Sequence, residues 1–150
     1  MASFNIDSRS ADPSLHFRTL HVMVVDDTPM HRKMIIRALK AIEGTKRSNL
    51  IIHIHEGTDG SDAIEMVAQS NSPTAKHKYD VIFIDYDMVN INGAVAIKSV
   101  REKHGYLGRI FAVTANESEA EHMKLKEAGA TSIFIKPLRI EQLKLLIDDL

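Results

Sequence analysis

The sequence contains no cysteine and no tryptophan. Without cysteine, a disulfide scaffold and a thiolate metal site are both excluded. Charge of neither sign dominates, because 19 lysines and arginines face 20 aspartates and glutamates, so nucleic acid is not indicated as a partner. No apolar run approaches the roughly 20 residues of a membrane span, and the amino terminus lacks the apolar segment of a secretory signal. We therefore expect a cytoplasmic protein without membrane contact.

The composition that is present is typical of one globular domain. The chain has 150 residues, 44% of them hydrophobic and 26% charged, which is enough for a substantial single core. Residues 1–19 are polar and show no periodicity. We expect this segment to be a flexible tail or linker, followed by one domain over residues 20–150.

Short apolar runs alternate with amphipathic helical patterns along the rest of the chain. The apolar runs cover residues 20–25, 50–55, 79–85, 109–115 and 131–135. The helical patterns cover residues 29–42, 57–69, 93–104, 118–129 and 139–150. This alternation predicts βαβ units with helices on both faces of a parallel sheet. We expect an α/β, flavodoxin-like, doubly wound sheet of five strands in the order 2-1-3-4-5, with five helices.

Local signals predict where two of the helices begin and one ends. Thr28 is a suitable N-cap for a helix with Pro29 at its first position, where a missing N–H costs nothing. Ser118 and Glu121 match a capping box at the start of the fourth helix. Gly129 is suited to end that helix.

The apolar side chains predict which helix faces are buried. Met34 is expected on the inner face of the first helix and Val95 on that of the third. We interpret five methionines as residues that fill gaps in the core. They are Met23, Met30, Met34, Met66 and Met88.

Polar side chains that carry chemistry follow the apolar runs. The first run ends in Asp26 and Asp27, and the third ends in Asp85 with Asp87 two residues later. The fourth ends in Thr114 and the small Ala115, and Lys136 follows the fifth. An adjacent pair of aspartates alone also fits an acidic turn. In a parallel sheet, however, the carboxyl ends of the strands meet at one edge, where ligands bind. We therefore expect several carboxylates, one hydroxyl and one ammonium around a single crevice.

This set of groups restricts the chemistry. Carboxylates without nitrogen or sulfur ligands suit Mg²⁺, which keeps waters for a phosphate. A carboxylate is also a nucleophile for phosphoryl groups and then forms an aspartyl-phosphate. A lysine and a hydroxyl opposite the metal would bind the remaining phosphoryl oxygens. We interpret Asp26 and Asp27 as metal ligands and Asp85 as the phosphoryl acceptor.

Four motifs carry a family resemblance in order and spacing. "VMVVDDTP", "YDVIFIDYDM", "IFAVTA" and "GATSIFIKPL" resemble the phosphoacceptor receiver domains of two-component response regulators and hybrid histidine kinases. The resemblance covers residues 20–150. It implies a switch in phosphorelay signalling, which catalyses only its own aspartyl phosphorylation and dephosphorylation. The partner would be a sensor histidine kinase or a histidine phosphotransfer protein, either separate or covalently linked in a longer chain.

The resemblance also implies a role for each residue of the site. Asp85 would be phosphorylated, and Thr114 and Lys136 would bind the phosphoryl group. The peptide bond before Pro137 would be cis. Mg²⁺, or another divalent cation such as Mn²⁺, would be held by the side chains of three aspartates and the backbone carbonyl of a fourth. These are Asp26, Asp27 and Asp85, with the carbonyl of Asp87.

The sequence departs from the family pattern at three positions. Val89 replaces the usual proline after the acceptor, and Asn92 replaces the usual aspartate before a glycine. We therefore expect the loop after the third strand to be more mobile. Ile133 occupies a position that is often aromatic, so a rotating aromatic ring is not available there to couple phosphorylation to an output surface.

Two other functions compete with this interpretation. In a haloacid-dehalogenase-type phosphohydrolase, "VIFIDYDM" would carry the nucleophile and general acid, and "LLIDDL" the last acidic motif. Order argues against it, because Asp148 and Asp149 lie in a helical pattern and Asp26 and Asp27 would have no role. In a pseudo-receiver, the domain would bind partners without phosphorylation, which the complete acidic set argues against.

Two histidines alternate on one face of the predicted edge strand. His53 and His55 could form part of a metal site. With no third ligand in view, we interpret them instead as part of a charged, solvated edge.

Overall fold

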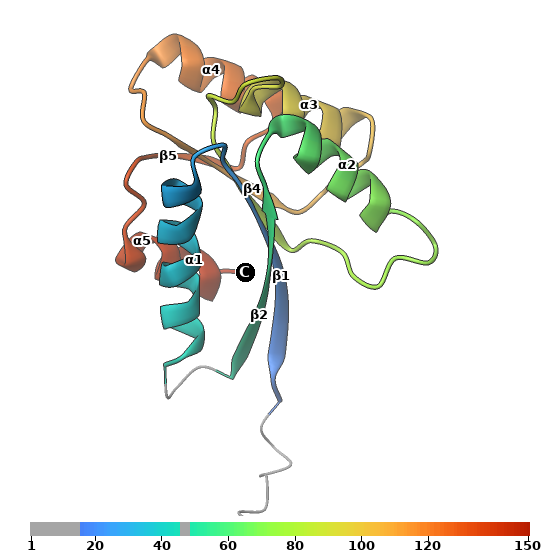
Figure 1. Ribbon diagram of the computed structural model, residues 1–150, viewed down its shortest axis with the longest axis vertical. Coiled ribbons are helices and arrows are strands. Elements are labelled where there is room, and N and C mark those ends of the chain that lie inside the picture. Colours follow the sequence, from blue (N-terminus) through green and yellow to red (C-terminus); the bar gives the residue numbers. More distant parts are fainter. Residues whose placement is uncertain (1–15, 46–48) are drawn as a thin grey trace, which may run out of the picture.

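The computed structural model describes residues 16–45 and 49–150, and these form a five-stranded parallel sheet with helices on both faces (Figure 1). The sheet order is β2-β1-β3-β4-β5, as predicted. The strands are β1 (Arg18–Val25), β2 (Leu50–Gly57), β3 (Val81–Ile84), β4 (Arg109–Thr114) and β5 (Ser132–Ile135). The helices are α1 (Pro29–Glu43), α2 (Gly60–Ser70), α3 (Gly93–Glu102), α4 (Glu119–Ala128) and α5 (Ile140–Asp148).

The predicted boundaries hold to within a few residues. β1 begins two residues earlier than expected, at Arg18, which pairs with Leu50 of β2. Residues 1–15 of the predicted tail lie outside the described part of the chain. Thr28 precedes α1 as its N-cap, and Gly129 ends α4 with a φ of 112°, a left-handed conformation that favours glycine. No helix in the described part of the chain is long and apolar enough to cross a membrane.

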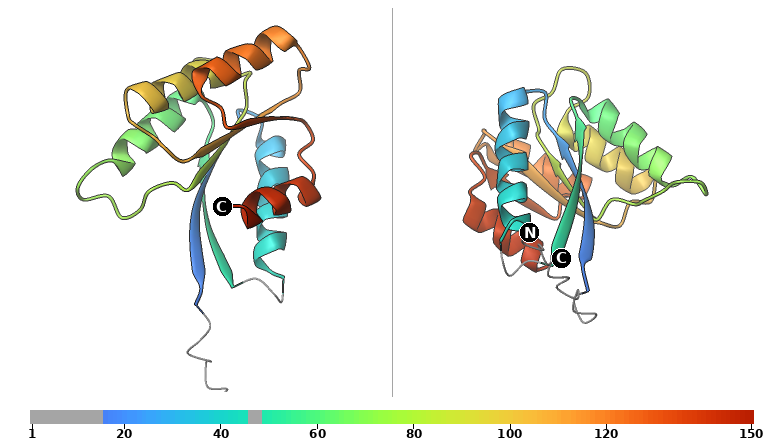
Figure 2. Two further views of the ribbon diagram at one scale, coloured as in Figure 1. Left: turned by 180° about the vertical axis from the view of Figure 1, so that it is seen from behind. Right: turned by 60° about the horizontal axis from the view of Figure 1, so that its bottom comes forward.

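The core consists of two apolar layers, one on each face of the sheet. Helices cover both of these faces (Figure 2). Alternate residues of β1 point to opposite faces, so Val22 and Val24 pack on the α1–α5 side while Met23 and Val25 pack on the other. β3 is buried along its whole length. Such strands need cover on both faces, and the helices supply it.

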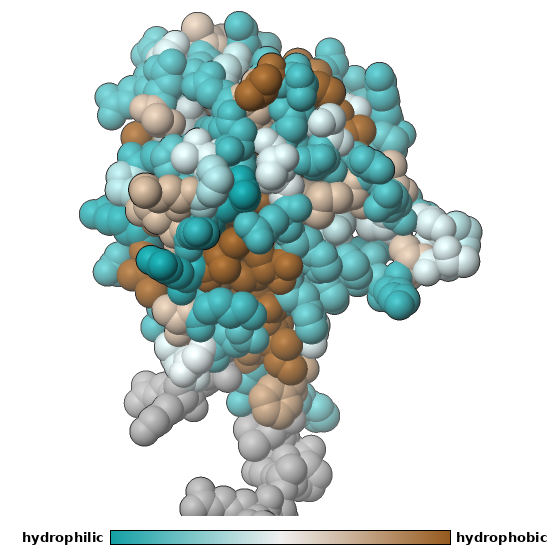
Figure 3. Space-filling view, in the orientation of Figure 1, coloured by the Kyte–Doolittle hydropathy of each residue, from teal (hydrophilic) through white to brown (hydrophobic). Residues whose placement is uncertain are grey.

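The edge strand β2 is covered less completely. In Figure 3, hydrophobic side chains gather along it, and Ile51 is 37% exposed. In Figure 1, the amino-terminal halves of β1 and β2 extend beyond α2. This helix therefore leaves part of the sheet face on which it packs open.

Three predictions of buried side chains were wrong. Met30, Met34 and Val95 are exposed. The buried stripe of α1 runs through Ile35, Leu39 and Ile42, and Met34 lies beside it rather than in it. α3 likewise turns small and branched residues inward, and Val95 faces away from them. An apolar residue next to a helical stripe does not have to be buried, because much of a protein surface is apolar.

Candidate functional site

Three aspartates meet at the carboxyl ends of β1 and β3. Asp26 and Asp27 follow β1 and Asp85 follows β3, and these two strands are paired neighbours. One carboxylate oxygen from each aspartate lies within 4.8 Å of the others. The backbone N–H of Asp85 donates to the carbonyl of Val25 at 2.9 Å, which continues the ladder and fixes the two strand ends side by side. Asp26 and Asp85 are buried, and Asp27 is half-buried.

Lys136 reaches this acidic cluster from the end of β5. Its Nζ lies 2.7 Å from Oδ2 of Asp26 and 3.2 Å from Oδ1 of Asp85. The Lys136–Pro137 peptide bond is cis, as the resemblance implied. His31, on α1, completes the surroundings, with its Nδ1 2.9 Å from Lys136 Nζ. No sequence pattern pointed to His31, because its place depends on how the start of α1 meets the segment that follows β5.

The charges of the acidic cluster do not balance. Burial and the neighbouring carboxylate of Asp26 raise the pKa of Asp85 to about 6, although Lys136 opposes this shift. Three carboxylates face a single ammonium, so the cluster carries excess negative charge when all are ionised. All three ligands are oxygens, and such a set suits a divalent cation of the Mg²⁺ type. The residues therefore fit the metal that the sequence predicted.

Thr114 is buried at the end of β4, but its hydroxyl is directed to a glutamate. It donates to Oε1 of Glu121 at 2.5 Å and accepts from the N–H of Asn116 at 3.2 Å. Glu121 therefore does not complete the predicted capping box, although Ser118 caps its backbone N–H at 3.5 Å. That part of the prediction was wrong, because a buried carboxylate needs a strong donor and the hydroxyl supplies one. Among the hydrogen bonds of the described residues, none joins Thr114 to Asp85.

Asp87 stands apart from the other predicted ligands. Its side chain is exposed and does not belong to the group of carboxylates that lie within 4.8 Å of one another. Only its backbone carbonyl was expected to bind metal, and an exposed side chain is compatible with that role.

The chain after β3 returns closely past Asp85. Gly93 N–H donates to the carbonyl of Tyr86 at 2.8 Å, and a Cβ at position 93 would clash with the carbonyl oxygen of Asp85. Glycine is therefore required at this close approach. Asn92, which departs from the family pattern, caps α3 by accepting from the N–H of Val95 at 2.9 Å.

A third buried aspartate, Asp59, was missed by the sequence interpretation and anchors the same loop. Asp59 caps α2 and also accepts from the N–H groups of Asn90 and Ile91, at 3.0 and 3.3 Å. Burial alone would raise the pKa of Asp59, but these bonds and two from Ser61 together lower it. The capping signal of Asp59 was visible in the sequence, whereas its contact with a loop 31 residues away was not. This anchor holds part of the loop in which Val89 replaces proline.

The acidic pair of the phosphohydrolase alternative lies elsewhere. Asp149 pairs with Arg109 at 2.8 Å, and Arg109 begins β4. Asp85 follows the carboxyl end of the neighbouring β3. Asp149 and Asp85 therefore lie at opposite ends of the strands. The last acidic motif of that family therefore has no counterpart at Asp85.

Comparison with known proteins agrees with this geometry. A family model described as the response regulator receiver domain matches residues 22–148. The two-component response regulator 24 of Arabidopsis thaliana is 30% identical over 135 residues, which cover 87% of this chain and 84% of that protein. The osmosensing histidine protein kinase SLN1 of Saccharomyces cerevisiae is 27% identical over 131 residues, which cover 87% of this chain. This chain thus spans only 10% of the length of SLN1.

A solved structure shows the same fold. The receiver domain of the sensor histidine kinase PA1611 from Pseudomonas aeruginosa superimposes with a TM-score of 0.70 at 20% identity, over 88% of this chain and 97% of that one. In that structure a magnesium ion is coordinated in the active site cleft. Fold, strand-end residues and sequence relatives lead to one conclusion: the chain belongs to the response regulator receiver domain family of two-component signalling.

Proposed function

We propose that Asp85 accepts a phosphoryl group from a phosphohistidine and that the domain acts as a phosphorylation switch. The phosphodonor would be a sensor histidine kinase or a histidine phosphotransfer protein, separate or in the same longer chain, in the cytoplasm. The observation that carries the proposal is the buried carboxylate of Asp85, which lies 3.2 Å from Lys136 Nζ and beside two further carboxylates.

The arrangement supports a direct transfer. The ionised Asp85 oxygen attacks phosphorus, and the bond from phosphorus to the imidazole nitrogen of the donor breaks. Lys136 is close enough to neutralise the phosphoryl oxygens as charge shifts onto them. Thr114 can donate to the phosphoryl group only after its hydroxyl leaves Glu121. The hydroxyl would therefore bond to Glu121 before phosphorylation and to the phosphoryl group afterwards.

We propose Mg²⁺, or Mn²⁺ in its place, as the cofactor. It would be held by Asp26, Asp27, Asp85 and the carbonyl of Asp87, and when bound it supplies positive charge that offsets the repulsion between the carboxylates and the phosphate. The magnesium ion of the PA1611 receiver domain supports this assignment by analogy. The domain would catalyse only its own phosphorylation and dephosphorylation.

The test is phosphorylation by a small phosphodonor with and without Mg²⁺, followed by intact-mass measurement. We expect the wild-type chain to gain one phosphoryl group with Mg²⁺ and none in chelator, and Asp85→Asn to gain none. The exposed Asp149→Asn is the matched control and should behave as wild type.

Labelling of Asp85→Asn would contradict the choice of acceptor. If no donor labels the wild type and beryllofluoride with Mg²⁺ does not perturb it, the pseudo-receiver alternative is correct. Steady turnover of a generic phosphomonoester would instead support the phosphohydrolase.

A further inference from the structure

Four histidines gather on the face of the sheet that α2 leaves open. His21 belongs to β1, His53 and His55 to β2, and His77 to the loop between α2 and β3. His21 is the register partner of His53, and His55 lies two residues further along the same face. The interpretation of His53 and His55 as a solvated edge relied on the lack of a third ligand, and the fold supplies two more imidazoles.

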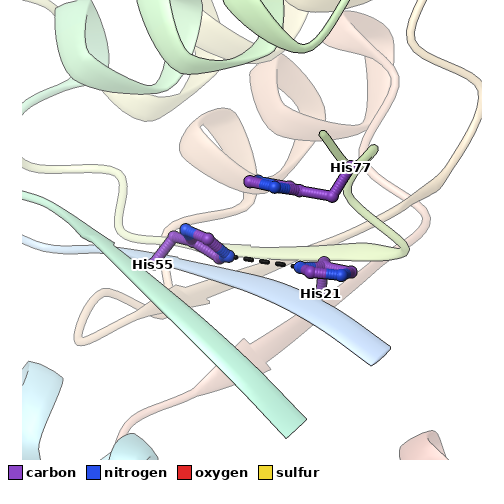
Figure 4. Close-up of side chains that lie close together, drawn as sticks. All are labelled: His21, His55 and His77. Atoms are coloured by element: carbon purple, nitrogen blue, oxygen red, sulfur yellow. Dashed lines mark hydrogen bonds between the residues drawn. The ribbon is translucent and has the colours of Figure 1, made fainter. Parts of the chain in front are cut away.

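Three of these side chains offer nitrogens close together (Figure 4). One ring nitrogen from each of His21, His55 and His77 lies within 4.8 Å of the others, and all three side chains are half-buried. Nδ1 of His21 and Nε2 of His55 are joined by a hydrogen bond of 3.3 Å, in which one nitrogen donates and the other accepts. Two nitrogens on a tetrahedral zinc ion, each about 2.0–2.1 Å from the metal, are about 3.3–3.4 Å apart. The two nitrogens thus have the spacing of two ligands on one ion, and an ion would replace the hydrogen that lies between them once the donating ring adopts its other tautomer.

The third ring needs a local movement. His77 stacks on His21 with ring centroids 4.3 Å apart and on His55 at 4.4 Å. The lone pairs of stacked rings run parallel and do not converge on one point, so His77 has to turn for all three nitrogens to bind one ion. His77 lies in a loop outside the helices and strands, and its neighbours Lys76 and Lys78 are exposed. The turn therefore disturbs little of the core.

The surroundings favour neutral imidazoles. Burial, followed by the charge of neighbouring histidines, lowers the pKa of both His21 and His55. Only a neutral imidazole has a lone pair free for a metal. The buried ring of Tyr79 lies edge-on to His55 and His77, with ring centroids 5.2 Å apart, and adds apolar contact to both.

We propose that His21, His55 and His77 form a binding site for a divalent transition-metal ion of the Zn²⁺ type. The donor set contains imidazole nitrogen only, which suits Zn²⁺, Cu²⁺ or Ni²⁺ and does not suit Mg²⁺. Three protein ligands leave the fourth tetrahedral position for water or for His53, whose ring stacks on His21 at 4.9 Å. Asp26 follows His21 by five residues along the extended β1, or about 16 Å, so this site is separate from the acidic cluster.

Such an ion would attach the α2–β3 loop to the sheet. β1 and β2 supply two ligands from rigid neighbouring strands, and the loop supplies the third. Occupancy should therefore raise the stability of this uncovered corner of the fold by binding only the folded state.

The test is a titration of the full chain with Zn²⁺. The buffer contains excess Mg²⁺, which occupies the acidic cluster. We expect one Zn²⁺ per chain by calorimetry and a higher melting temperature. His77→Ala and His55→Gln should each raise the Kd at least about tenfold, as expected for the loss of one of three ligands. The exposed His16→Ala is the matched control and should bind as wild type.

X-ray absorption of the zinc-loaded wild type gives an independent readout that no variant can confound. Three nitrogen ligands of imidazole type are expected, or four where His53 takes the last position. Unchanged affinity in both histidine variants, or an oxygen-dominated coordination shell, would overturn the proposal. Loss of Zn²⁺ binding in Asp27→Asn with full binding in His77→Ala would overturn it as well, because the ion would then sit at the acidic cluster.

Discussion

The acidic cluster (Asp26, Asp27 and Asp85) and the histidine cluster (His21, His55 and His77) both bring three ligands within 4.8 Å, yet they differ in charge. The acidic cluster is held around an ammonium, that of Lys136, and remains negative when ionised. The histidine cluster consists of groups that repel one another only when protonated. The first cluster needs a hard cation to reach neutrality, whereas the second offers lone pairs that bind a softer ion. We therefore expect two clusters of similar size to bind different metals, because their ligand atoms differ.

Removal of the ammonium should have the largest effect. Lys136→Met leaves the buried Asp26 and Asp85 without their charged partner, and we expect a loss of about 3 kcal/mol in the free energy of unfolding in chelator. Urea denaturation measures it, with the exposed Lys33→Met as the control. Equal losses in the two variants would mean that Lys136 does not offset the charge of the acidic cluster.

Metal selectivity should divide the two clusters. At a hundredfold excess over its Kd, Mg²⁺ should stabilise the wild type by about 2.7 kcal/mol. Asp27→Asn should lose most of this gain and should be more stable than wild type in chelator, because one repelling charge is removed. His77→Ala should keep the full response to Mg²⁺. A lost response in His77→Ala, measured by thermal melting, would break the separation between the clusters.

Lowering the pH should stabilise the fold through the acidic cluster and destabilise it through the histidine cluster. The effect of Asp85 should be the larger of the two. Its folded pKa of about 6 exceeds its ordinary value of 3.8, so the protonated carboxyl favours folding. This contribution is full below the ordinary pKa and is lost as the pH rises to about 6, a change of about 1–3 kcal/mol in chelator. Asp85→Asn should lack it, which urea denaturation across this pH range would detect. An identical pH profile in the variant would refute the raised pKa.

The histidine cluster should produce the opposite trend. The lowered pKa of His21 and His55 means that the unfolded chain takes up protons first, so stability is lost as the pH falls through the ordinary value of 6.5. In Asp85→Asn this decline should be seen without the opposite effect of the Asp85 carboxyl. Adding His77→Ala should weaken it, because the charge of His77 is, after burial, one cause of the lowered pKa of both histidines. A steeper decline in the double variant would show that the histidines do not repel one another.

The smallest expected effect concerns a buried carboxylate outside both clusters. Asp59 is satisfied by backbone and hydroxyl donors and needs no cation. Asp59→Asn should cost about 1 kcal/mol, since an amide oxygen accepts more weakly than a carboxylate. Mg²⁺ should not restore this loss. Hydrogen exchange at Asn90 and Ile91 should be faster in the variant, and unchanged exchange would show that Asp59 does not hold the loop.

The sequence by itself determined the sheet and the meeting of the acidic cluster with Lys136. Apolar runs alternating with amphipathic helices require a parallel sheet, and in a parallel sheet the carboxyl ends of paired strands are neighbours. Asp26 and Asp85 directly follow paired strands, so strand order was enough to bring them together. Lys136 follows β5, which β4 separates from β3, and its long side chain reaches Asp85 from the same end of the sheet.

Only the tertiary structure decided which residues the side chains of Thr114, Asp59 and His77 contact. Thr114 bonds to Glu121 because a buried rotamer places the two side chains together, and the local capping signal of Glu121 favoured another bond. Asp59 reaches the loop after β3, and His77 reaches His21, because of the paths that two connections take across the fold. Periodicity specifies which side of a strand or helix is buried, whereas the path of a loop and the rotamer of a side chain depend on packing between residues far apart in the chain.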